Sequence, residues 1–226
     1  ELAIFTQLTQ DHLDYHKDME HYFQAKRLLF SNQPLPRRLL INKDCPYGLR
    51  LLGEHPAAKS LSLKGPADYE AVAISSSIQG SQFRLRFKGR EVPFQIRLPL
   101  RHNVANVATV LAALDLLGFD PEEFRGALAE IPGIPGRMES VSSPEEAFQI
   151  FVDYAHTPDA IENVLAEALK LKPSRILTLL GCGGDRDRSK RPLMGRAACL
   201  YSNIVILTSD NPRSEDPEAI LADIRK

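Results

Sequence analysis

The last third of the chain alternates apolar runs with amphipathic stretches three times, and this alternation limits the possible folds more than any other feature. The apolar runs are QIFVD, RILTLLG and NIVILT, at residues 149–153, 175–181 and 203–208. Stretches with the helical spacing of apolar residues follow them, at residues 158–172, 189–201 and 217–225. A repeated strand–helix unit predicts a parallel sheet whose strands are joined by crossover helices.

The preceding part of the chain predicts a second α/β domain. Its strands are expected at residues 2–5 and 37–42, and its helices at residues 18–30, 102–118 and 120–131. From about residue 50 to residue 100 the pattern is antiparallel, because QFRLRF alternates apolar with polar residues, KGR turns the chain and VPFQIRL alternates back. The loop GIPGR, Gly133–Arg137, is the best candidate junction, so we predict domains at 1–137 and 138–226.

Composition excludes several classes of protein. A formal net charge of −1 over 226 residues gives no general attraction to nucleic acid or to an anionic membrane. No apolar run approaches the roughly 18 residues of a membrane helix. The three cysteines are odd in number and widely spaced, which indicates neither a disulfide framework nor a metal pair and favours the reducing cytoplasm. Because the chain opens one residue before a strand and closes inside a helical pattern, we expect a piece of a longer protein.

The stretch DHLDYHKDMEHYFQAK, Asp11–Lys26, gathers many titratable groups after the first strand. At 100° per residue, Lys26 lies in the middle of the apolar stripe of the predicted helix. Two interpretations remain open: a lysine that extends to the rim of the stripe, or a buried lysine that needs a partner or a chemical change. Asp11 and His12 leave the strand at the edge where ligands collect, and a histidine with nearby carboxylates suits a divalent metal; a zinc pair of His12 and His16 lacks further ligands.

A polar loop follows each of the three later strands. The loops are VDYAHTP, GCGGDRDRSKRP and TSDNPRSEDP, at residues 152–158, 181–192 and 208–217. Successive strand exits share one edge of a parallel sheet, which is the usual ligand edge of such folds. Arginine and lysine are interleaved with aspartate in these loops, so either a solvated surface or a site for a zwitterionic or multi-anionic ligand fits them.

Nearly the whole chain resembles the Mur ligases, and within them the MurE type. The resemblance rests on TQDHLDYH, AKRLLF, LPLRHNVANV, IPGRME, VDYAHTPDA, GCGGDRDRSKRPLMG and SDNPRSEDP. It implies a central ATPase-type α/β domain with an antiparallel β portion, followed by a truncated Rossmann-like C-terminal domain. It also implies an ATP-dependent ligase of peptidoglycan precursor synthesis. In this reaction, ATP phosphorylates a substrate carboxylate, the incoming amine attacks the acyl phosphate, and phosphate leaves.

The resemblance implies a role for individual residues. His12 would bind Mg²⁺, and Lys26 would be carbamylated and help to hold the metal. The residues expected around ATP are Asn103 and Asn106 near the adenine, Arg137 and His156 near the phosphates, and Asp153 on the ribose. The residues expected to bind the incoming amino acid are Arg186, Asp210, Asn211, Pro212 and Arg213.

The segment DNPR resembles the signature of ligases that add meso-diaminopimelate. Diaminopimelate carries a second carboxylate that lysine lacks, and Arg186 and Arg213 can pair with it. The partners implied are small molecules: ATP, the UDP-muramoyl dipeptide and meso-diaminopimelate. Nucleic acid and membrane insertion are not expected, and the protein is expected to be a monomer.

One departure from the family pattern matters: no GxxxxGK[ST] phosphate loop occurs in the chain. The N-terminal domain that holds the uridine nucleotide and the end of the last domain are absent too. We therefore predict that these residues alone do not catalyse ligation. Two alternatives stay open, a sister ligase such as folylpolyglutamate synthase and a non-catalytic nucleotide- or metabolite-binding module.

Overall fold

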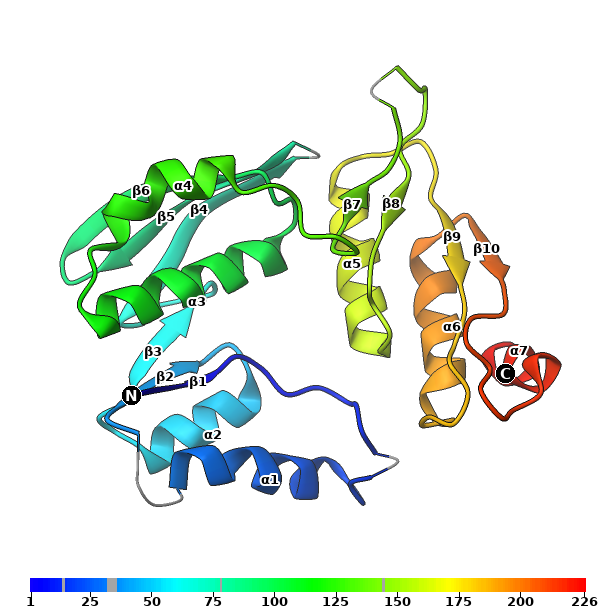
Figure 1. The fold of residues 1–226 in the computed structure, drawn as a ribbon, viewed down its shortest axis with the longest axis horizontal. Helices are drawn as coiled ribbons and strands as arrows, with labels where there is room; N and C mark the ends of the chain where they lie inside the picture. The colour runs from blue at the N-terminus through cyan, green and yellow to red at the C-terminus, as the bar shows by residue number, and fades with distance from the viewer. Residues whose placement is uncertain (14, 32–35, 78, 144) are drawn as a thin grey trace. The chain divides into compact units, whose positions relative to one another are not determined.

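The computed structural model describes residues 1–226 except 14, 32–35, 78 and 144 (Figure 1). Its internal contacts divide the chain into two compact units. Unit 1 comprises Glu1–Leu8 and Phe23–Asp153, and unit 2 comprises Thr9–Tyr22 and Tyr154–Lys226. The expected α/β class is confirmed, whereas the division after Arg137 stays a prediction.

Unit 1 is built on a mixed six-stranded sheet in the order β1-β2-β3-β4-β5-β6. The strands are β1 Leu2–Phe5, β2 Arg38–Asn42, β3 Lys59–Ser62, β4 Tyr69–Ser77, β5 Gly80–Phe87 and β6 Arg90–Ile96. The pairs from β1 to β4 are parallel, and β4, β5 and β6 are antiparallel. The predicted hairpin is confirmed: Lys88 and Gly89 turn the chain with φ of 47° and 73°. Phe83 and Phe94 pair across β5 and β6 on the buried face.

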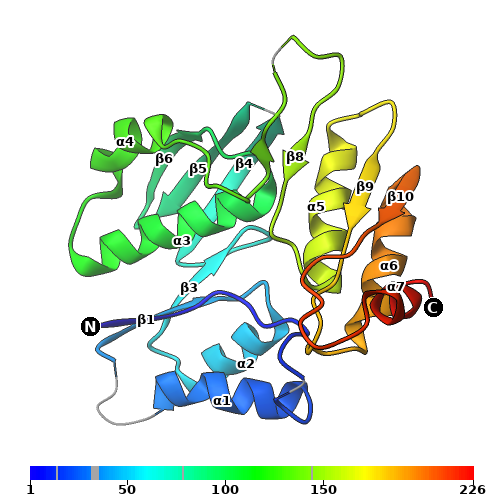
Figure 2. The ribbon, with the colours of Figure 1, turned by 45° about the vertical axis from the view of Figure 1, so that its right-hand side comes forward.

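Helices cover this sheet. They are α1 Met19–Ser31, α2 Pro46–Glu54, α3 Arg101–Leu117, the short 3-10 helix η1 Pro121–Phe124, and α4 Arg125–Glu130. Helix α3 lies along the sheet in Figures 1 and 2 and buries Val104, Ala108 and Leu111 in the core. It ends at Gly118, whose left-handed φ of 99° is the usual helix stop. Helix α2 was not predicted, because the antiparallel signal was extended back to residue 50.

The expectation of three parallel strands in the last third is wrong for the first of them. Strand β8 is only Phe151–Val152, and it pairs antiparallel with β7, Glu139–Ser140. The Val141 amide also donates to the Ile150 carbonyl at 3.0 Å. The local hairpin with β7 therefore takes the hydrogen bonds that a parallel neighbour would have used.

Unit 2 keeps the other two strand–helix pairs as predicted. Its elements are α5 Pro158–Lys170, β9 Leu177–Leu180, α6 Lys190–Tyr201, β10 Ile204–Leu207 and α7 Pro217–Ile224. Strands β9 and β10 are parallel and lie side by side, with α5 and α6 beside them in Figure 2. The core joins Leu165 of α5, Leu180 of β9, Met194 of α6 and Ile220 of α7. No helix in the described part of the chain is long and apolar enough to cross a membrane.

Candidate active site

Two glycines let the second and third polar loops of unit 2 lie directly against each other. A Cβ added to Gly184 would lie 1.8 Å from the Pro212 carbonyl oxygen, and one added to Gly181 would lie 2.9 Å from that of Thr208. The Gly184 amide donates to the Asn211 carbonyl at 2.8 Å. Only glycine permits so close a backbone approach, so GCGG and DNPR form one continuous surface.

Asp185 and Ser214 join the same two loops by side-chain hydrogen bonds. The Ser214 hydroxyl donates to Asp185 Oδ1 at 2.7 Å, and the Ser214 amide donates to Oδ2 at 3.2 Å. In the opposite direction, the Asp185 amide donates to Glu215 Oε1 at 2.6 Å. Asp185, Ser214 and Glu215 thus join the two loops by three hydrogen bonds.

A buried ion-pair network underlies the loops. Arg191, in the first turn of α6, is 1% exposed, and its guanidinium lies 2.7 Å from Glu215 and 3.0 Å from Asp223. Arg188 also contacts Glu215, at 2.6 Å. The hydrogen bond from Arg191, followed by those from the Asp185 amide and Arg188, lowers the pKa of Glu215 to about 2. Glu215 therefore stays ionised over the whole physiological range.

The two arginines predicted to bind the amino acid differ from these paired ones. Arg186 and Arg213 are exposed, and among the described residues neither takes part in an ion pair. Arg213 has a left-handed φ of 49° and donates to the Gly184 carbonyl, while Arg186 donates only to the carbonyl of Asp185, at 3.4 Å. Asp210 and Asn211 lie on the same loop and are also exposed. The surface thus carries two exposed arginines that form no ion pair among the described residues, although the Asp185 charge acts on Arg213.

The Asp11 carboxylate lies close to three titratable side chains of unit 2, two of which are predicted site residues. Its carboxylate lies 3.4 Å from the Lys190 ammonium and 3.5 Å from Nε2 of His156, and His12 Nε2 lies 3.5 Å from it as well. Burial raises the pKa of Asp11, but the His12 amide and the Lys190 charge outweigh it and hold the pKa below its ordinary value. His156 precedes α5, whose first amides are capped by the Thr157 hydroxyl.

The remaining ATP-site candidates lie in unit 1. Asp153 accepts a hydrogen bond from the Met138 amide at 2.9 Å, so the ribose candidate and the GRME turn that carries the exposed Arg137 are brought together. Asn103 is buried at the start of α3 and donates to the Pro99 carbonyl at 2.7 Å. Asn106 lies one turn further along α3 and is exposed.

Of the two interpretations of Lys26, the buried lysine is wrong and the lysine at the rim of the stripe fits. Lys26 is exposed, and the buried positions of α1 are Tyr22, Phe23 and Phe30. Phe30 packs edge-on against Phe5 of β1, and Phe23 contacts Tyr47 of α2. The buried residues span the apolar stripe seen in the sequence, and Lys26 stays exposed at an angle between Tyr22 and Phe30.

Metal-ligating side chains are sparse in the parts of the chain described. No three His, Cys, Asp or Glu side chains there gather closely enough to hold an ion. His16 stacks on Tyr22 with a centroid distance of 4.8 Å, and His12 lies edge-on to the same ring at 5.8 Å. Tyr22 and Lys26 are four residues apart on α1, the spacing of side chains on one helix face.

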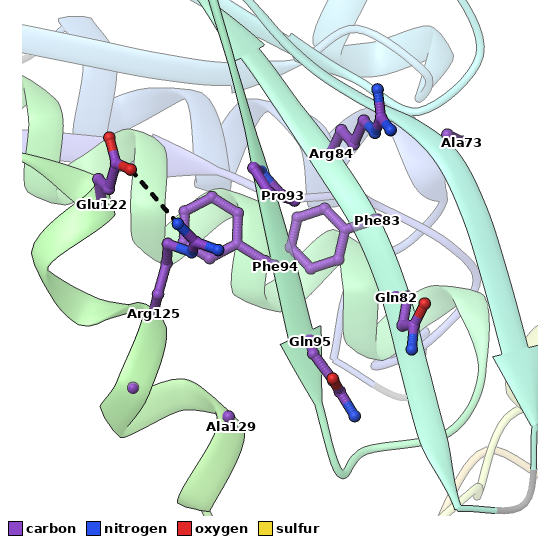
Figure 3. Close-up of a pocket in the computed structure, with 11 residues that line it drawn as sticks. Ala73, Gln82, Phe83, Arg84, Pro93, Phe94, Gln95, Glu122, Arg125 and Ala129 are labelled. Carbon is purple, nitrogen blue, oxygen red and sulfur yellow. Dashed lines mark hydrogen bonds and ion pairs between the residues drawn. The ribbon is translucent and has the colours of Figure 1, made fainter.

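A hollow of about 790 Å³ in unit 1 contains none of the predicted site residues (Figure 3). It lies between β5, β6 and α4, and its lining includes Gln82, Gln95 and Arg125. The guanidinium of Arg125 already donates to Glu122 at 3.4 Å, as the dashed line in Figure 3 shows. The hollow has no convergent unpaired charge, and we assign it no function.

Sequence reasoning missed Glu215, Lys190 and Asp11 as organising residues of the site. Glu215 lies two residues beyond DNPR, and its importance depends on Arg191, which is distant in sequence. Asp11 was grouped with His12 after the first strand, but its contacts with Lys190 and His156 were not predicted.

Comparison with protein families gives two matches that together span most of the chain. The Mur ligase middle domain matches residues 1–114, and the glutamate ligase domain of Mur ligases matches residues 136–226. The first match alone covers half of the chain. Both matches agree with the resemblance noted in the motifs.

Individual relatives point the same way. A UDP-N-acetylmuramoyl-L-alanyl-D-glutamate–2,6-diaminopimelate ligase from a Synechocystis strain is 44% identical over 98% of this chain and 45% of its own length. A solved structure of such a ligase has a TM-score of 0.66 at 36% identity, with coverage of 100% of this chain and 47% of that one. The UDP-N-acetylmuramate–alanine ligase of Thermotoga maritima, at 22% identity over 99% of this chain and 48% of its own, has a TM-score of 0.73 and shows the fold alone. The chain thus spans about half the length of the relatives it matches.

Proposed function

The chain belongs to the Mur ligase family, and on this premise we propose that it forms part of an ATP-dependent ligase adding 2,6-diaminopimelate to UDP-N-acetylmuramoyl-L-alanyl-D-glutamate. The observation that carries the proposal is the 44% identity, over nearly the whole chain, to a ligase with that activity in its name. The segment DNPR and its exposed Arg213 support the choice of amino acid. A cytoplasmic location and a monomeric state stay predictions.

The proposed reaction forms one amide bond. The terminal carboxylate of the muramoyl dipeptide attacks the γ-phosphate of ATP, which gives an acyl phosphate and ADP. The amine of diaminopimelate then adds to the acyl carbon, and the tetrahedral intermediate expels phosphate and leaves the amide. We assign ATP to Asn103, Asn106, Arg137, Asp153 and His156; the hydrogen bond between Asp153 and the turn that carries Arg137 supports this grouping.

We propose Mg²⁺ as the metal, with His12 and a carbamate on Lys26 among its ligands. The exposure of both side chains fits this role, because the lysine amine is accessible to carbon dioxide and the imidazole to a hydrated ion. Carbamylation replaces an ammonium, which would repel a dication, by an anion that attracts it. When bound, Mg²⁺ would neutralise charge on the phosphate oxygens during transfer.

We assign the second carboxylate of diaminopimelate to Arg186 and Arg213. Guanidinium groups bind carboxylates through two parallel hydrogen bonds, and these two form no ion pair with a carboxylate among the described residues. Lysine would leave both groups unpaired in the closed site, which penalises the wrong substrate. Asp210 of the same loop provides an anion for the amino group at that end of diaminopimelate.

The test is phosphate release by a longer protein that contains these residues and a phosphate loop. Release is expected only when ATP–Mg²⁺, the UDP-muramoyl dipeptide and meso-diaminopimelate are all present. Glutamate-dependent turnover with a folate substrate would instead identify the sister ligase. Calorimetric binding of ATP–Mg²⁺ with no turnover under any condition would identify a binding module.

A further inference from the structure

Arg186 and Arg213, which form no ion pair among the described residues, are each next to a residue that forms hydrogen bonds between their two loops. Asp185 directly precedes Arg186, and Ser214 directly follows Arg213. The Asp185 carboxylate accepts both the hydroxyl and the amide of Ser214, at 2.7 and 3.2 Å. One interloop contact therefore lies a single residue away from both guanidinium groups.

Glu215 adds a second contact between the same two loops. Its Oε1 accepts the Asp185 amide at 2.6 Å and the buried Arg191 guanidinium at 2.7 Å. Its Oε2 is occupied by Arg188 at 2.6 Å. All of these groups belong to unit 2, and we call Asp185, Ser214 and Glu215 the latch.

We propose that the latch is a positioning device that sets the spacing between Arg186 and Arg213 and thereby selects an amino acid with a second carboxylate. This inference rests on the proposed function, because it concerns the same amino-acid site. In this proposal the role of the latch residues needs no contact with the substrate. They act through the two arginines whose backbone they hold.

The distribution of ion pairs among the charged residues supports the proposal. The two loops and α7 carry Arg186, Arg188, Arg191 and Arg213 together with several carboxylates, among them Asp185, Glu215 and Asp223. Arg188 and Arg191 pair with Glu215 and Asp223, whereas Asp185 accepts hydrogen bonds from Ser214 and interacts electrostatically with Arg213 without forming an ion pair with it. Without Ser214, Asp185 would be available to pair with Arg213 directly and would compete with the substrate carboxylate.

Preorganisation gives the second physical argument. Gly184 already holds the loops in contact through its close approach to Pro212, but it cannot fix the direction of the residues beyond it. The left-handed φ of 49° at Arg213 is uncommon for a residue other than glycine. The hydrogen bonds between Ser214 and Asp185 hold the backbone immediately after Arg213. Ordering a loop during binding costs free energy and lowers the affinity for the ligand, so loops that are already held in place bind it more tightly.

The test compares Ser214→Ala and Glu215→Gln with the matched control Glu218→Gln, which lies on α7 outside the latch. In the longer ligase, both latch variants should raise KM for meso-diaminopimelate about tenfold, since a hydrogen bond to a charged group is lost. The kcat at saturating diaminopimelate and the KM for ATP should stay within about twofold, and the preference for diaminopimelate over lysine should fall. A purely structural role would lower kcat and all affinities together through loss of folded protein.

The outcomes separate the two proposals. If the wild-type protein does not use diaminopimelate at all, the proposed function is wrong. If the wild type prefers diaminopimelate and both latch variants keep the same KM and preference, the latch inference is wrong while the function stands. Ser214→Ala removes one hydroxyl only, so it remains informative if Glu215→Gln fails to fold.

Discussion

Single charged residues of unit 2 have sharply different surroundings although they are neighbours in sequence. Arg191 is buried between two carboxylates, whereas Arg186, five residues earlier, is exposed without an ion-pair partner in the described part of the chain. The first arrangement holds loops together, and the second presents charge to a ligand. Which arginine takes which role follows from the positions of Glu215, in the third loop, and Asp223, on α7.

The lowered pKa of Glu215 predicts a specific acid sensitivity. Because its folded pKa is about 2 and its ordinary value is 4.5, its contribution to stability is complete above pH 4.5. That contribution is lost as the pH falls from about 4.5 towards 2, since the unfolded state then binds the proton more tightly. Thermal unfolding midpoints measured across this range should fall less steeply in Glu215→Gln than in the wild type. Parallel curves for the two proteins would contradict the prediction.

The carbamate proposal predicts a rescue experiment. In the longer ligase, Lys26→Ala should reduce kcat roughly 100-fold, because an electrostatic group at the phosphates is lost. Added short-chain carboxylate should restore part of the activity, since it can take the place of the carbamate. Lys17→Ala, which removes an exposed lysine shortly before α1, is the control and should leave kcat unchanged. Wild-type activity in Lys26→Ala would count decisively against the role.

At the scale of elements, the loops after β9 and β10 act as one body because Gly184 lies against the Pro212 carbonyl. Gly184→Ala should therefore force the loops apart and lower the free energy of unfolding by about 1–3 kcal/mol, the usual cost of overpacking. Gly126→Ala is the matched control: no atom lies within 4 Å of its added Cβ, and its position in α4 favours alanine by up to about 1 kcal/mol. Chemical denaturation of both variants measures the difference. Equal stability of the two variants would show that the loops do not need this contact.

The elements that were predicted correctly carry their signal locally. Helix α3 has a long apolar pattern and a glycine stop, and the β5–β6 hairpin has strict alternation around KGR. Two failures depend on tertiary partners. The exposure of Lys26 depends on where Phe30 and Phe23 of α1 meet Phe5 and Tyr47, and β8 takes β7 as its partner through a hairpin that the sequence pattern did not indicate.

The same limit applies to the candidate site. The motifs predicted which loops carry the polar residues, and the structure of unit 2 brings DNPR and GCGGDR together. Motifs did not indicate that Asp11 contacts Lys190, because the two residues belong to separate motifs that lie far apart in sequence. Contacts of this kind depend on the packed structure rather than on any residue spacing.

At the scale of the whole molecule, the 226 residues span about half the length of the relatives and contain no GxxxxGK[ST]. We predict that these residues alone release no phosphate from ATP in the presence of both other substrates, since nothing cradles the β- and γ-phosphates. A malachite-green phosphate assay on the purified 226-residue chain checks this. Turnover above a heat-denatured control would overturn the prediction.

The choice of amino acid is the central claim, and a competition experiment tests it most directly. A longer ligase containing these residues is given equimolar meso-diaminopimelate and L-lysine with ATP–Mg²⁺ and the UDP-muramoyl dipeptide, and the products are separated by mass spectrometry. We predict that the diaminopimelate product exceeds the lysine product by at least about 100-fold, because lysine leaves guanidinium groups unpaired. A lysine product equal to or larger than the diaminopimelate product would contradict the account.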